Sequence, residues 1–242
     1  MLAKQYTTEV LALTQRVIDS QAEQIERAAD LIFSSLRKDA LLHVFGCGHS
    51  HILSEECFYR AGGLVPINPI FETSTMLHEG AVKSSQIERM SGYAELILAN
   101  YEVHAGECLL IFSTSGINAL PIEMAISAKK KGLSVVALTS CCYLNHPSRY
   151  PTGEHLADIA DLVIDTQIPC GDALLRLSST VSAVPGSTVV GCTLLNALIA
   201  EILERYRQNG MTPPVFTSGN TEGGYEKNLG YIAAYRNRVR AL

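Results

Sequence analysis

Short apolar runs that end in glycine- or hydroxyl-rich turns recur along this 242-residue chain, and helical patterns separate them. Each run has the length and composition of a strand buried on both faces of a parallel sheet. Strands that alternate with helices predict a doubly wound α/β fold, a three-layer α-β-α sandwich with helices on both faces. The expected strands are Ala40 to Phe45, Leu64 to Asn68, Cys108 to Phe112, Leu133 to Thr139 and Asp161 to Asp165.

Helical periodicity predicts the layers that cover this sheet. Apolar residues at helical spacing predict a long amphipathic helix over residues 5–37. Residues 69–107 interrupt the alternation of strands and helices, and we expect them to form a lid or a wall over a site. A basic helix is expected at the end of the chain. Other helices are expected over residues 50–61, 84–99, 120–131 and 189–204.

The composition indicates a packed globular protein. Hydrophobic residues make up 47% of the chain and charged residues 18%, so we expect a buried core. The net charge of −5 provides no basic surface, and we expect neither nucleic acid nor a membrane as a partner. An anionic ligand must therefore be held by local groups.

The first residues and the cysteines indicate the compartment. Residues 1–6 lack the apolar segment of a signal peptide, and no run of about 18 apolar residues is available to span a membrane. A cytoplasmic protein is therefore expected. The seven cysteines are odd in number and show no C-x-x-C spacing, so we expect them to be reduced thiols.

One domain accounts for most of the chain. Residues 1–208, which include the N-terminal helix, are expected to form it, because a chain of this length seldom builds a second core. Residues 209–242 are expected to form a C-terminal extension that packs on the same domain or on a neighbouring subunit.

Two turns after expected strands are the candidate phosphate-binding elements. Ligands of open α/β sheets bind beyond the carboxyl ends of the strands, where helix N-termini present free N–H groups. Residues 113–118 offer three hydroxyl groups and several backbone donors within one turn, and residues 46–50 allow close approach of an anion through two glycines. The candidate phosphate ligands are Ser113, Thr114, Ser115, Gly116 and Asn118, and the candidate sugar ligands are Gly46, Gly48, His49, Ser50, Thr139 and Ser187.

Other phosphate motifs are absent. The chain has no G-x-x-x-x-G-K-[ST] motif, and a dinucleotide-binding turn would need glycine or alanine where His51 stands. The second expected strand ends at Asn68 rather than at a ribose-binding acid. We therefore expect no NAD and no other cofactor.

The order of the motifs resembles the SIS (sugar isomerase) domain family. The resemblance covers most of residues 5–208 and rests on strand-G-C-G-H-S-helix, strand-S-T-S-G-I-N-helix and the later A-L-T-S strand end. It implies a five-stranded parallel sheet of flavodoxin-like order and a sugar phosphate bound at residues 113–115. The segments around residues 215–220, 171–172 and 88–93 are similar to those of an uncharacterised subgroup labelled as phosphoheptose isomerases.

Phosphoheptose isomerases carry a metal site that this chain does not match. By resemblance, their first two ligands, a histidine and a glutamate, fall at positions that hold Glu56 and Arg60 here, and the helix over residues 189–204 has no histidine. Neighbouring histidines at a helix start, such as His49 and His51, are more often solvated or capping than metal-binding. We therefore expect no metal.

Isomerisation of an aldose phosphate to a ketose phosphate needs a base that moves a proton between C1 and C2, and donors that stabilise the enediolate. The candidate bases are Glu56, by its position after the glycine turn, and Glu88, in the interrupting segment. An aldose–ketose sugar-phosphate isomerase is therefore the expected activity. A lyase resembling N-acetylmuramic acid phosphate etherases and a non-catalytic sugar-phosphate sensor remain alternatives.

The apolar helices exceed what one small sheet can cover, and SIS proteins commonly assemble. We therefore expect a homodimer or homotetramer, and residues 212–228 are the candidate contribution to a neighbouring site.

Overall fold

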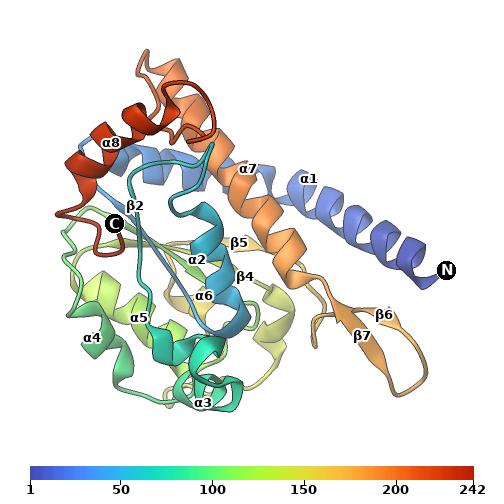
Figure 1. The fold of residues 1–242 in the computed structure, drawn as a ribbon. Coiled ribbons are helices and arrows are strands. Elements are labelled where there is room, and N and C mark those ends of the chain that lie inside the picture. The colour runs from blue at the N-terminus through green and yellow to red at the C-terminus, as the bar shows by residue number, and fades with distance from the viewer.

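The computed structural model describes all 242 residues and contains a five-stranded parallel sheet between two layers of helices (Figure 1). The sheet has the order β2-β1-β3-β4-β5, so the doubly wound fold and its flavodoxin-like order are confirmed. The strands are β1 (Leu42–Gly46), β2 (Ile67–Pro69), β3 (Cys108–Phe112), β4 (Ser134–Thr139) and β5 (Leu162–Asp165).

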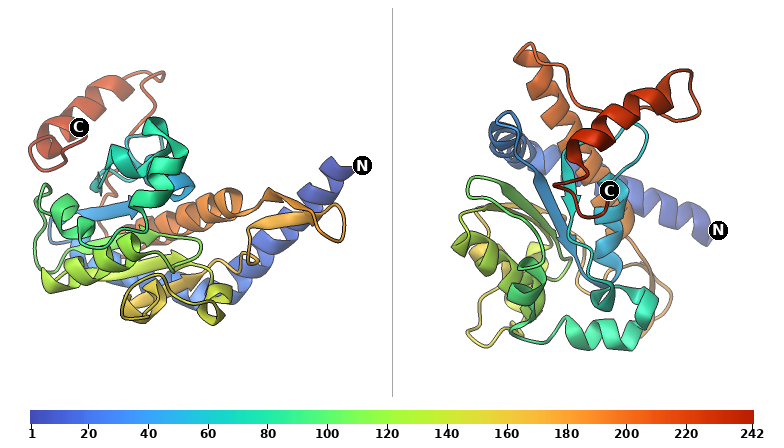
Figure 2. Two further views of the ribbon diagram at one scale, coloured as in Figure 1. Left: turned by 90° about the horizontal axis from the view of Figure 1, so that it is seen from below. Right: turned by 60° about the vertical axis from the view of Figure 1, so that its left-hand side comes forward.

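Alternating strand residues divide the core into two clusters. Along β3, Leu110 and Phe112 face one layer, whereas Leu109 and Ile111 face the other, as the two-residue period of a strand requires. The layers lie on opposite faces of the sheet (Figure 2). One consists of α1 (Leu2–Leu36), α2 (His51–Cys57) and α7 (Ser187–Gln208), and the other of α4 (Tyr93–Leu98), α5 (Ala119–Lys130) and α6 (Leu156–Ile159).

The helices expected over residues 50–61 and 84–99 differ from the observed ones. The first is preceded by a 3₁₀ turn, Gly48–Ser50, and ends at Cys57. The second is two helices, α3 (Ala81–Ile87) and α4, because Gly92 between them takes the left-handed conformation with φ of 87°. The part of the wall segment expected as one helix over residues 84–99 is therefore two short helices with a joint at Gly92.

A β-hairpin precedes α7 and was not predicted. Its strands are β6 (Ala173–Arg176) and β7 (Ser182–Pro185), and it lies next to the projecting N-terminal half of α1 (Figure 1). The Tyr6 hydroxyl donates a hydrogen bond to the Pro185 carbonyl over 3.0 Å. The hairpin and α1 thus extend together beyond the sheet.

The C-terminal extension pairs with its own domain. The Gly62 N–H donates to the Phe216 carbonyl over 2.8 Å, and the Phe216 N–H donates to the Gly63 carbonyl over 3.0 Å. Leu64 forms an isolated antiparallel bridge to Val215, whereas β2 begins at Ile67, three residues later than expected, where it pairs with the start of β1. The chain then ends with α8 (Gly224–Tyr235).

Helix α7 is long and apolar enough to span a membrane by length and composition alone, with a mean hydropathy of 1.4 in its most apolar window. Core helices meet the same criterion. Leu194, Leu198 and Ile202 of α7 are fully buried in the cluster that α1 shares, so packing within the domain accounts for these apolar residues.

A network of buried hydrogen bonds connects the start of β1 to the turn before β3. Glu107 accepts hydrogen bonds from the Leu41 N–H (3.0 Å), the His104 N–H (2.8 Å) and the His43 ring (2.8 Å). The other His43 nitrogen accepts from the Asn68 amide over 3.1 Å, so the proton of the imidazole faces Glu107. Burial raises the pKa of Glu107, but the three hydrogen bonds outweigh it and hold the pKa below its ordinary value.

Replacing this carboxylate should destabilise the fold. Glu107→Gln puts an amide donor against existing donors, and we expect a loss of about 1–3 kcal/mol in the free energy of unfolding at pH 7, measured by urea denaturation. The stabilisation that the Glu107 carboxylate gives to the wild type is fully present above the unfolded-state pKa of a glutamate, roughly 4.3. It is lost as the pH falls through the lower pKa of Glu107 in the folded state. Glu102→Gln, at an exposed glutamate paired with His104, is the control. Equal stability of the two variants at pH 7 would contradict this role of Glu107.

Candidate functional site

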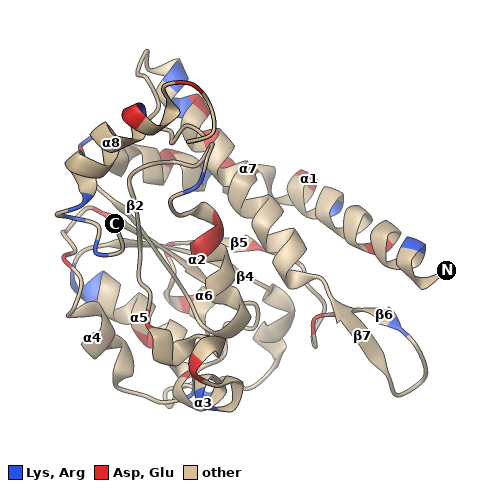
Figure 3. Cartoon of the chain, in the orientation of Figure 1, with Lys and Arg blue, Asp and Glu red and all other residues tan.

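A cavity of about 380 Å³ opens at the carboxyl ends of the central strands, where ligands of such sheets bind. The turns after β1 and β3, the start of α7 and part of the segment 69–107 form its walls. No lysine or arginine lines it; Figure 3 shows such residues elsewhere in the chain, for example near the N-terminal end of α1. The predicted site residues that line it are Gly48, His49, Ser50, Glu88, Ser113, Thr114, Ser115, Asn118 and Ser187.

The turn after β3 presents free backbone donors to this cavity. The Ser113 hydroxyl accepts a hydrogen bond from the Gly116 N–H over 3.2 Å, which closes the turn. The N–H groups of Thr114 and Ser115 have no acceptor within the protein. Together with the hydroxyls of residues 113–115, these donors form an uncharged candidate cradle for an anion in the turn that leads from β3 to α5.

Gly116 and Thr139 support the turn after β3 on the side away from the cavity. Neither lines the cavity. Gly116 has φ of 61°, and a Cβ on it would lie 2.7 Å from the Thr139 hydroxyl oxygen. Glycine is therefore required at this position both by its backbone conformation and by the approach of β4.

The glycine turn after β1 forms the opposite wall. Gly46 does not line the cavity, but a Cβ there would lie 2.6 Å from the Ser50 carbonyl oxygen, so glycine is needed to close the turn. The N–H groups of Gly48 and His49 have no acceptor within the protein. This wall therefore offers further donors to a ligand.

The start of α7 already holds an anion, the carboxylate of Asp172. It accepts hydrogen bonds from the N–H groups of Gly186 (3.1 Å) and Ser187 (2.8 Å) and from the Ser187 hydroxyl. A carboxylate at a helix N-terminus is favourable for the same reason as a phosphate there. The start of α7 therefore offers these groups to no further anion, and the free donors of this cavity belong to the turns after β1 and β3.

Glu88 is the carboxylate that the segment 69–107 brings into the cavity. Its Oε1 accepts a hydrogen bond from the Asn118 amide over 2.8 Å, and the Asn118 carbonyl oxygen accepts one from Arg149 over 2.6 Å. Burial raises the pKa of Glu88, and these polar neighbours only partly offset that effect. Burial and the nearby Glu88 also raise the pKa of Cys47, so its thiol is not activated.

Glu56, the other predicted base, does not line the cavity. Its carboxylate forms an ion pair with Arg60 on the same helix and accepts a hydrogen bond from the Asn196 amide of α7 over 3.1 Å. It faces the contact between α2 and α7.

Sequence reasoning missed part of the cavity wall. Tyr143 follows β4, and its hydroxyl oxygen accepts a hydrogen bond from the Gly171 N–H over 2.7 Å. Ser84 and Ser85 of α3 also line the cavity. Tyr143 belongs to no recognisable sequence motif, so no signal identified it. Ser84 and Ser85 lie in the segment 69–107, which was expected to form a wall of the site.

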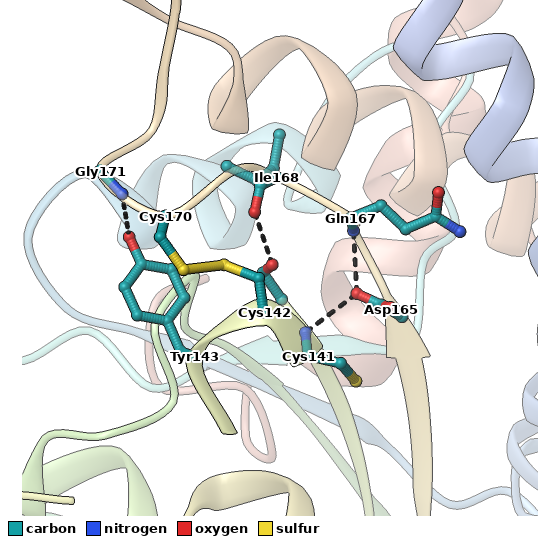
Figure 4. Close-up of a disulfide and its surroundings, with 9 residues drawn as sticks. Cys141, Cys142, Tyr143, Asp165, Gln167, Ile168, Cys170 and Gly171 are labelled. Atoms are coloured by element: carbon teal, nitrogen blue, oxygen red, sulfur yellow. Dashed lines mark hydrogen bonds between the residues drawn. A yellow bond between two sulfur atoms is a disulfide. The ribbon is translucent and has the colours of Figure 1, made fainter. Parts of the chain in front are cut away.

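A disulfide bond between Cys142 and Cys170 joins two of the loops at the cavity (Figure 4). The expectation of reduced thiols is therefore wrong for this pair. Asp165 between them accepts hydrogen bonds from the N–H groups of Cys141 (3.0 Å) and Gln167 (2.9 Å), so the loops after β4 and β5 are also joined without the bond. Neither an odd cysteine count nor a 28-residue spacing identified the pair.

Comparison with known proteins agrees with this architecture. The profile of the SIS domain family matches residues 5–140. A UPF0309 protein of Caldanaerobacter subterraneus subsp. tengcongensis is 47% identical over 242 residues, which cover 98% of each chain.

Solved structures show the same fold at low sequence identity. The phosphoheptose isomerase GmhA from Neisseria gonorrhoeae has a TM-score of 0.55 and 16% identity, over 84% of this chain and 99% of that chain. The Vibrio vulnificus NanR protein complexed with ManNAc-6P has a TM-score of 0.56 and 15% identity, over 97% of this chain and 69% of that chain.

The disulfide should contribute measurably to stability. Reduction reopens a 28-residue loop, and we expect the free energy of unfolding to fall by about 3–4 kcal/mol in urea denaturation. Cys142→Ser should reproduce the loss, whereas Cys141→Ser, at the neighbouring free cysteine, should not. Alkylation of the unreduced, denatured chain should modify five of the seven cysteines; modification of all seven would show that the bond is absent.

Proposed function

Because the chain belongs to the SIS domain family, as one of its UPF0309 proteins, we propose that the cavity binds a sugar phosphate whose phosphate group sits at the turn of residues 113–118. The observation that carries this proposal is the pair of unpaired N–H groups on Thr114 and Ser115, in the turn between β3 and α5, in a cavity without lysine or arginine. The NanR structure with ManNAc-6P has the same fold and supports the ligand class.

We propose further that the protein isomerises this sugar phosphate between aldose and ketose forms, with Glu88 as the base. Glu88 and Asp172 are the acidic residues that line the cavity, and Asp172 is engaged at the start of α7. A carboxyl group with a raised pKa is closer to the value that a general base needs near neutral pH. The side chains of His49, Ser50 and Tyr143 supply donors for the enediolate oxygens.

A non-catalytic sensor is the second candidate. The sugar isomerase domain of the RpiR transcription factor from Sphaerobacter thermophilus favours it, because that domain has a TM-score of 0.50 and 19% identity over 98% of this chain. The etherase-like lyase has less support, because it uses glutamates both to abstract and to donate protons, and Glu88 is the one glutamate that lines the cavity.

We also propose that the chain forms a homodimer or homotetramer. The projecting part of α1 exposes apolar side chains, with Leu2 56% and Leu11 62% exposed. The solution mass, measured by light scattering, tests this proposal, and a mass of one chain contradicts it.

Proton exchange tests the catalytic proposal. In D₂O the wild type should incorporate deuterium at C2 of a bound sugar phosphate, and the rate should rise with pH as Glu88 loses its proton at a pKa above the ordinary value. Glu88→Gln should lower the rate by at least about 100-fold. The variant should still be stabilised thermally by the ligand, because Asn118 can donate to the glutamine oxygen as well.

The alternatives give different results in the same experiment. Loss of proton exchange in Glu56→Gln but not in Glu88→Gln would identify Glu56 on α2 as the base instead of Glu88. Thermal stabilisation of wild type without exchange, over a panel of hexose and heptose phosphates, identifies a sensor. Release of lactate from an N-acetylmuramic acid phosphate identifies a lyase.

A single hydroxyl of the cradle should affect affinity. Ser115→Ala removes one donor and keeps the backbone N–H, so we expect the dissociation constant for the sugar phosphate to rise about fivefold, measured by calorimetry. Ser91→Ala, at an exposed serine outside the cavity, is the matched control. Unchanged affinity in Ser115→Ala would place the phosphate elsewhere.

A further inference from the structure

His51 has one ring nitrogen available for a ligand. Its side chain is buried, with 5% of its surface exposed, and its Nδ1 contacts the Gly48 carbonyl oxygen. A carbonyl can only accept a hydrogen bond, so Nδ1 carries the proton. The lone pair of the neutral ring is then at Nε2. Histidines that bind metals are oriented in this way, with the second nitrogen donating to a carbonyl or carboxylate.

Glu55 lies one helical turn beyond His51, with its Oε1 3.1 Å from Nε2. Two lone pairs at this distance repel unless a cation lies between them, either a proton or a metal ion. Two ligands of a tetrahedral zinc ion, with bonds of about 2.0–2.1 Å, are roughly 3.3 Å apart. The observed separation is close to that value.

His78 supplies a third donor from a different part of the chain. It belongs to the 3₁₀ turn Leu77–Glu79, and the centroid of its ring is 5.5 Å from that of His51, with the rings near perpendicular. The ligand atoms of His51, Glu55 and His78 all lie within 4.8 Å of one another. A shared proton needs two partners, so the convergence of a third favours a metal ion.

We propose that His51, Glu55 and His78 bind a divalent transition metal of the zinc type. Two histidines and a glutamate are a common zinc ligand set, which leaves a fourth position for water. Glu55 and His78 are exposed, so that position is open to solvent. The site is distinct from the one in phosphoheptose isomerases, whose corresponding positions hold Glu56 and Arg60, and it revises the expectation of no metal.

The bound metal joins two walls of the cavity. Gly48, whose carbonyl orients His51, and Leu77, which precedes His78, both line it. The metal therefore ties the segment 69–107 to α2. This inference does not rest on the identity of the cavity's ligand or on catalysis.

Metal titration of the purified protein tests the proposal. After treatment with a chelator, the wild type should bind one Zn²⁺ per chain in calorimetry, and Zn²⁺ should raise its melting temperature. His78→Ala and Glu55→Gln, both at exposed side chains outside the core, should each weaken binding by at least about tenfold. His104→Ala, at an exposed histidine paired with Glu102, should bind as wild type does.

Cobalt(II) distinguishes this site from the free cysteines. The proposed ligands should give weak visible bands without thiolate-to-cobalt charge transfer. A charge-transfer band, or equal affinity in wild type and both variants, shows that the metal is elsewhere and overturns the proposal. No binding to wild type also overturns it and leaves a protonated His51 paired with Glu55.

Discussion

The parallel pairing of β1 with β3 is the contact on which the candidate site depends. Gly46 stands opposite Phe112 in this ladder, so the turns that follow the two strands begin side by side. The chain order reverses at this point of the sheet, because β2 lies beyond β1 and β4 beyond β3. Such a reversal opens a crevice between neighbouring strand ends, and the cavity lies there.

Elements that depend only on neighbouring residues, such as a buried strand and the turn that follows it, could be predicted from the sequence. The apolar run of β3 and the turn after it were placed correctly, because a buried strand followed by small and hydroxyl residues allows few other structures. The joint at Gly92 could not be predicted, since the periodicity of residues 84–99 continues through this glycine. Periodicity also could not show that Glu56 faces α7 rather than the cavity, because a 3₁₀ turn starts the helix and alters its phase.

Contacts between distant segments account for the remaining differences. Cys142 meets Cys170, and His51 meets His78, through loops whose paths follow from tertiary packing. The Asp172 carboxylate also occupies the start of α7 through such a long-range contact and accepts hydrogen bonds from Ser187, which was predicted as a sugar ligand. Sequence therefore predicted the fold and the position of the turn after β3, whereas the structure identified the groups that face this turn.

Asn118 links the two ends of the cavity. It belongs to the turn proposed to bind the phosphate, and its amide also donates a hydrogen bond to the Glu88 carboxylate. A phosphate dianion bound at this turn would repel a negative charge on Glu88. By thermodynamic linkage, binding of such a ligand would then take up protons wherever Glu88 is partly ionised, and protonation would tighten binding by the same factor. Under the proposed function, occupancy of the cavity is thus coupled to the basicity of its own carboxylate.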